Sequence, residues 1–247
     1  MDNGWILAGT TFLASAVEAV EALTIVLAVG VTRSWRTAMS GALWALTVLA
    51  AICLILGPAI VSYVPLGVLR LIVGIFLILF GLAWLRKAVL RYSGRKALHD
   101  EDAIYAREVE QLRAAGKQPG RDPLGFATSF KAVLLEGLEV AVIVVTFGAQ
   151  SMNGFWWAGA GAALALVLVT LLGIALRKPA AQVPENAMKF VVGIMLTSFG
   201  TFWTGEGLGI EWWHADLSIV LLAIGYLAVS GVLVAIARRG NATLRPA

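Results

Sequence analysis

The sequence predicts an all-α integral membrane protein with seven transmembrane helices, an external N-terminus and a cytoplasmic C-terminus. Three observations lead to this fold class: long apolar blocks, a regular alternation of basic and non-basic loops, and an internal repeat. Of the 247 residues, 60% are hydrophobic and only 14% are charged. Because soluble domains carry roughly 25% charged residues, this composition excludes a water-soluble protein.

Seven apolar blocks are long enough to cross a hydrocarbon layer of about 30 Å. They cover residues 5–31, 37–60, 66–90, 125–149, 155–176, 186–205 and 217–237. The first block lacks the basic leader of a cleaved signal peptide, so we expect it to remain as a membrane helix. Between the third and fourth blocks, the acidic run that starts at Asp100 predicts a short capped helix over residues 98–115. The alternative for residues 99–102 is a cytoplasmic metal site.

Lysine and arginine gather in every second loop. Basic residues follow the first, third, fifth and seventh blocks and are absent from the N-terminus and from the other loops. By the positive-inside rule, this alternation places the N-terminus outside and the C-terminus in the cytoplasm. The expected location is the cell (inner or plasma) membrane, which the chain crosses several times. Since the basic residues flank membrane segments, the net charge of +4 does not indicate nucleic acid. The expected partner is the lipid bilayer, and a homo-oligomer is compatible with the sequence.

The second half of the chain repeats the first. Residues 64–84 and residues 183–203 are identical at nine of 21 positions, and residues 17–30 match residues 135–148. Each copy holds three helices, so the second copy must enter the membrane in the opposite sense. The sequence therefore predicts two inverted three-helix repeats plus one extra helix, with a site near the midplane at the repeat interface.

This repeat predicts four parts of the chain. The two repeats occupy residues 1–91 and 124–205, and residues 92–123 form a cytoplasmic loop with a short amphipathic helix. Residues 206–247 hold an outer loop, the seventh helix and a basic cytoplasmic tail.

Two Glu-x-x-Glu pairs occupy equivalent positions in the first helix of each repeat. They are Glu18/Glu21 and Glu136/Glu139, each near the middle of its apolar block. Glutamates three residues apart share one helix face. An ionised carboxylate at mid-membrane costs at least about 2.5 kcal/mol, so all four must face the interior and be compensated. Carboxylate oxygens suit iron, manganese, magnesium and calcium, which predicts a metal-cation site; hydrogen-bonded carboxyls that hold helices together are the alternative.

The segments VEAVEALTIV (17–26) and LEGLEVAVIV (135–144) resemble the duplicated Arg-Glu-x-x-Glu motif of the oxidase-dependent iron permeases. Those are seven-helix proteins, and the resemblance implies that Glu18, Glu21, Glu136 and Glu139 bind iron during permeation. The family's motif arginines are replaced here by Val17 and Leu135. More distantly, the spacing is similar to that of the calcium/manganese–proton exchangers, whose duplicated acidic motifs also lie on inverted repeats.

The expected function is a transporter or permease for a metal cation of the iron or manganese class, with a calcium/manganese–proton exchanger as the alternative. We expect no permanent cofactor: the ligand is the transported iron, manganese or calcium. Protons are the candidate coupling ion, because metal entry into a carboxyl site releases them. An intramembrane enzyme or a non-transporting scaffold is less favoured, since no nucleophile or metal–histidine motif accompanies the carboxylates.

Two further patterns give predictions. The outer loop carries Glu206, Glu211 and Asp216, which would form an acidic vestibule that attracts cations; an ordinary solvated loop is the alternative. Four glycines recur at seven-residue spacing in the third helix of each repeat, at Gly74, Gly81, Gly193 and Gly200. They predict close helix packing rather than chemistry.

Overall fold

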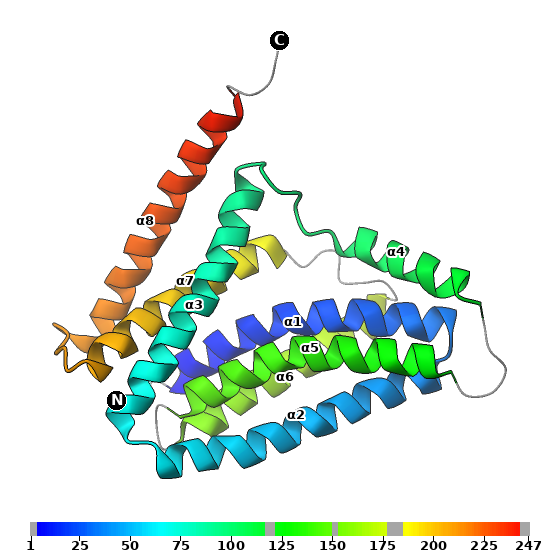
Figure 1. The fold of residues 1–247 in the computed structure, drawn as a ribbon, viewed down its shortest axis with the longest axis horizontal. Coiled ribbons are helices and arrows are strands. Elements are labelled where there is room, and N and C mark those ends of the chain that lie inside the picture. Colours follow the sequence, from blue (N-terminus) through cyan, green and yellow to red (C-terminus); the bar gives the residue numbers. More distant parts are fainter. Residues whose placement is uncertain (1–3, 117–121, 150–152, 177–184, 243–247) are drawn as a thin grey trace. The chain divides into compact units, whose positions relative to one another are not determined.

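The computed structural model describes residues 4–116, 122–149, 153–176 and 185–242, which form eight α-helices (Figure 1). In chain order these are α1 (Gly4–Thr32), α2 (Trp35–Tyr63), α3 (Leu66–Tyr92), α4 (Glu101–Ala114), α5 (Pro123–Gly148), α6 (Gly154–Leu176), α7 (Glu185–Gly207) and α8 (Ala215–Ala242). The all-α fold class is therefore confirmed.

Six of these helices are long and apolar enough to cross a membrane, counting only the described residues. They are α1, α2, α3, α6, α7 and α8. The remaining predicted span, the fourth in chain order, coincides with α5, which has 26 residues but carries Lys131, Glu136 and Glu139. Composition alone does not identify such a helix as a span, so the count of seven and the orientation of the termini stay predictions.

The short polar helix is confirmed, with bounds close to those predicted. Asp100 precedes α4 and its side chain accepts a hydrogen bond from the Ala103 backbone N–H at 3.1 Å, as an N-cap residue does. One face of α4 is apolar, and Leu112 is buried with Tyr105 and Val109 packed beside it. This face rests on a core formed by α1, α2 and α5 that includes Val29.

The helices gather into two compact units. The first comprises Met1–Ala59 and Asp100–Val183, and thus holds α1, α4, α5, α6 and most of α2. The second comprises Ile60–His99 and Pro184–Ala247, and thus holds α3, α7 and α8. Each unit draws helices from both halves of the sequence. The predicted division into repeats and loops is not tested by these units and stays a prediction.

Close backbone approaches hold the first unit together. In α2, a Cβ added at Gly41 would lie 2.6 Å from the Phe126 carbonyl oxygen of α5. In α6, a Cβ at Gly161 would collide with the Ala8 backbone of α1. Lipid tails are as apolar as the side chains, so helices in a membrane associate through close packing at small residues. The result is a bundle in which α1 lies beside both α5 and α6 (Figure 1).

The second unit is built on an antiparallel α3–α7 pair, and the four repeating glycines form its contact. A Cβ at Gly74 would lie 2.8 Å from the Gly200 carbonyl oxygen, and one at Gly81 would lie 2.9 Å from the Gly193 carbonyl oxygen. The prediction of close packing at these positions is therefore confirmed. The third helix of this unit, α8, joins α7 through a hydrogen bond of 2.8 Å between the Tyr226 and Thr201 hydroxyl groups.

Candidate functional site

Three of the four predicted glutamates converge in the first unit. One carboxylate oxygen each of Glu18, Glu136 and Glu139 lies within 4.8 Å of the other two. Glu18 comes from α1 and is 1% exposed, whereas the other two come from α5 and are partly buried. The three-residue spacing on α5 places both of its glutamates on the face toward α1, as the sequence predicted.

Local packing fixes this cluster. Gly137 separates the two glutamates of α5, and its missing side chain leaves room for Leu49 of α2, whose Cδ1 would overlap any added Cβ. Val17, the residue before Glu18, is fully buried, while Leu135, the residue before Glu136, is half exposed. A side chain as large as arginine would therefore meet different surroundings at these two equivalent positions of the repeat.

A cavity of about 440 Å³ opens beside the cluster, between α1, α2, α5 and α6. Glu18 and Glu136 both line it. Its other lining residues are apolar, apart from Ser15 and Cys53. This arrangement of a few polar groups in an apolar recess is typical of a binding site. No sequence pattern singles out Ser15, because one serine in an apolar helix has no distinctive spacing.

The electrostatics of the cluster require compensation. Two ionised carboxylates about 5 Å apart repel by roughly 3 kcal/mol at an effective dielectric constant of about 20, and three carboxylates make three such pairs. The cluster therefore favours bound protons or a cation, and a divalent cation removes most of the repulsion at once. A metal-cation site built on the two acidic pairs stays a prediction.

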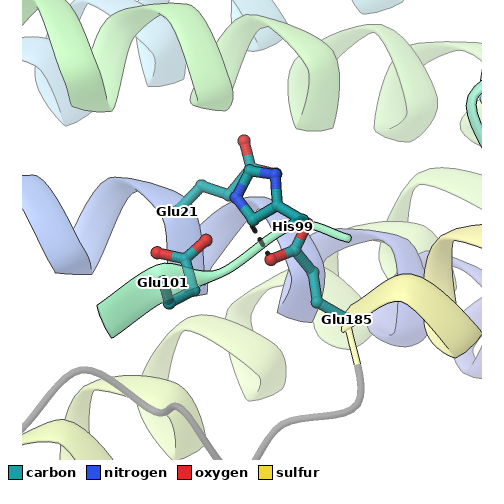
Figure 2. A group of neighbouring side chains, drawn as sticks. All are labelled: Glu21, His99, Glu101 and Glu185. Atoms are coloured by element: carbon teal, nitrogen blue, oxygen red, sulfur yellow. Dashed lines mark ion pairs between the residues drawn. The ribbon is translucent and has the colours of Figure 1, made fainter. Parts of the chain in front are cut away.

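Glu21, the fourth predicted ligand, is not a member of this cluster. One of its carboxylate oxygens lies instead within 4.8 Å of a carboxylate oxygen of Glu101, at the first turn of α4 (Figure 2). Glu101 is 6% exposed. In the sequence, Glu101 belongs to the acidic run expected to cap a solvated helix, since acidic residues at a helix start usually serve that purpose. A cytoplasmic metal site at residues 99–102 was the alternative, and it stays untested.

The second unit has a polar group of its own around the start of α7. His99 Nε2 lies 3.4 Å from Glu185 Oε2 (Figure 2), and Lys189 Nζ lies 3.2 Å from the other oxygen of the same carboxylate. Arg91 contributes an N–H that lies 3.0 Å from His99 Nδ1 and donates a second hydrogen bond, also of 3.0 Å, to the Asn186 side-chain oxygen. These contacts anchor the chain after α3 to the first turn of α7.

The three acidic residues of the predicted outer vestibule lie at the end of α7 and beyond it. Glu206 Oε2 forms an ion pair with Arg70 Nε of α3 at 3.5 Å. Glu211 is exposed in the segment that leads to α8. Asp216 falls in the first turn of α8, and its side chain lies outside the described residues. A role of these residues in attracting cations stays a prediction.

The apolar helices together with a match to a known family define a multi-pass membrane permease. A family model described as "Ferrous iron uptake permease, iron-lead transporter" matches residues 53–235, about three quarters of the chain. The chain belongs to this family, which confirms the resemblance inferred from the two glutamate motifs. Comparisons with curated proteins and with solved structures found no match.

The family is one of permeases rather than enzymes, and the match favours an iron permease over the exchanger alternative. The matched residues include Glu136 and Glu139 but begin after Glu18 and Glu21. Support for the first pair therefore comes from the internal repeat and from the position of Glu18 beside the second pair.

Proposed function

We propose that this protein moves a metal cation of the iron or manganese class across the cell membrane, through a site built on Glu18, Glu136 and Glu139. The observation that carries this proposal is the mutual approach of three carboxylate oxygens from two membrane helices. Membership of the iron permease family supports the class of substrate. The transported ion is the only metal that the proposal requires.

The spacing of the oxygens suits a shared ion. Two oxygens that bind one Ca²⁺ at about 2.3–2.6 Å can lie no more than about 5.2 Å apart, and for an ion bound at about 2.1 Å this limit is about 4.2 Å. The three oxygens all lie within 4.8 Å of one another, inside the separation that calcium allows. An ion bound at about 2.1 Å fits where the same oxygens lie within about 4.2 Å of one another.

Glu21 belongs to the same path in this proposal. It lies one turn beyond Glu18 on α1, about 4.5 Å further along the helix axis. We place it next along the route, with Glu101 beside it, so that the four glutamates predicted from the sequence serve successive positions. Because carboxyl ligands must lose their protons to bind metal, each arriving cation would displace protons, which couples the two ions.

Two inverted three-helix repeats, with seven spans and an external N-terminus, remain the architecture that we propose. The glycine contacts of the second unit support it. The 119-residue offset of the repeat takes Gly74 to Gly193 and Gly81 to Gly200, so it carries the Gly74/Gly200 contact onto the Gly81/Gly193 contact. The pairing of α1 with α5, the first helix of each repeat, supports it as well.

The test is metal uptake into proteoliposomes, with Mn²⁺ and, under anaerobic conditions, Fe²⁺. We expect Glu136→Gln and Glu139→Gln to reduce uptake at least about tenfold, because each removes a charged ligand but keeps the side-chain size. The matched control is Glu110→Gln, a carboxylate on the exposed face of α4 that lies outside the cluster. Equal uptake by the wild type and both cluster variants would contradict the proposal.

A further inference from the structure

Ser15 is a buried serine beside the carboxylate cavity. It lies one turn before Glu18 on α1, so that the two side chains share a helix face with Cβ atoms about 5–6 Å apart. Ser15 is 3% exposed and lines the same cavity as Glu18 and Glu136. Its Oγ makes no hydrogen bond to any residue that the structure describes.

Several other hydroxyls on the membrane helices do not share this property. Thr11, Thr24 and Ser198 each donate a hydrogen bond to the carbonyl oxygen four residues earlier, at 2.8, 3.0 and 2.7 Å. This local bond is the usual way in which a helix satisfies a buried serine or threonine. Leaving a buried hydroxyl without a partner destabilises a protein, and a cation held in the adjoining cavity would give the Ser15 hydroxyl a partner.

We propose that the Ser15 hydroxyl oxygen is a further ligand of the cation held by Glu18, Glu136 and Glu139. This inference rests on the proposed function. A serine oxygen is a hard, neutral donor, the type that suits manganese and iron(II) together with carboxylates. It raises the number of ligands without adding to the repulsion among the three carboxylates. Ser15 thereby contributes to affinity and to selection against softer metals.

The test compares metal binding by three serine variants of the full-length protein in detergent, measured as thermal stabilisation by Mn²⁺. We expect Ser15→Ala to weaken Mn²⁺ binding about tenfold, which corresponds to about 1.4 kcal/mol. Its melting temperature without metal should be equal to or above that of the wild type, because alanine removes an unsatisfied hydroxyl. Ser15→Cys should shift preference from Mn²⁺ toward Cd²⁺, since a thiolate is a softer ligand.

The matched control is Ser129→Ala. Ser129 on α5 is fully buried and its Oγ also has no hydrogen-bond partner among the described residues, yet it does not line the cavity. The Ser129→Ala variant should bind Mn²⁺ as the wild type does. If Ser15→Ala also binds like the wild type, or if Ser15→Cys keeps the original Cd²⁺/Mn²⁺ ratio, Ser15 is not a ligand.

A glutamate variant separates the two possible failures. If Glu136→Gln has lost Mn²⁺ binding while Ser15→Ala has kept it, the inference about Ser15 is wrong and the proposed site stands. If Glu136→Gln binds Mn²⁺ as the wild type does, the proposed site itself is wrong, and the inference about Ser15 fails with it.

Discussion

Gly200→Ala is the substitution whose effect on stability the structure determines best. A Cβ at this position would lie 2.7 Å from the Gly74 carbonyl oxygen and 2.7 Å from the Ile78 backbone nitrogen, whereas ordinary contact begins at 3.4 Å. Both neighbours are backbone atoms, which cannot rotate away as a side chain can. The helices α3 and α7 would therefore have to separate by about 0.7 Å at their contact.

Two opposing terms set the size of the effect. Overpacking of this kind costs about 1–3 kcal/mol. Alanine recovers about 0.8–1.0 kcal/mol through its higher helix propensity. The net loss is thus up to about 2 kcal/mol. With a shift of about 2–4 °C per kcal/mol for chains of this size, the melting temperature should fall by several degrees.

The assay is thermal unfolding of the purified protein in detergent, with Gly231→Ala as the control. Gly231 lies on α8, where an added Cβ would meet no atom within 4 Å, so this variant should melt at or above the wild-type temperature. The Gly74→Ala/Gly200→Ala double variant should lose less than the sum of the single losses, because both open the same contact. Equal melting temperatures for Gly200→Ala and Gly231→Ala would refute the packing argument.

Two predictions concern the cavity and its carboxyl groups. Cys53 is the only cysteine of the sequence, and it lines the cavity. Alkylation with a maleimide should therefore block metal uptake by the wild type and leave a Cys53→Ala variant active. If the reagent does not change uptake by the wild type, the cation does not pass through this cavity. Addition of Mn²⁺ to the protein in weakly buffered detergent should release about one proton or more per bound cation, which a pH indicator would report. The Glu136→Gln variant should release fewer protons. Metal binding without proton release would rule out coupling between the cation and protons.

The sequence predicts those parts of the structure that depend on composition and on local spacing. The apolar blocks correspond to helices, Asp100 caps α4, and the glycines at seven-residue spacing form the α3–α7 contact. Each of these features arises within a single helix or from the pairing of two similar helices. For the same reason, the spacing of Glu136 and Glu139 was sufficient to place both carboxylates on one face.

Contacts between distant and dissimilar segments were not predictable in this way. Glu101 approaches Glu21 although 80 residues separate them, and no repeat relates α4 to α1. The network of His99 and Glu185 likewise depends on how the chain after α3 meets the start of α7. The place of Ser15 beside a cavity follows from the packing of four helices, which periodicity along one helix does not encode.

Because Glu21 is not part of the cluster of Glu18, Glu136 and Glu139, the proposed site does not follow the symmetry of the repeat. Repeat symmetry alone would make Glu18/Glu21 and Glu136/Glu139 equivalent, and a symmetric site would present the same ligands to both sides of the membrane. The helix α4 has no second copy among the described residues, and it brings Glu101 to Glu21. The two ends of the proposed path therefore differ in charge and in neighbours. An asymmetric path of this kind allows entry and exit of the cation to be controlled by different residues.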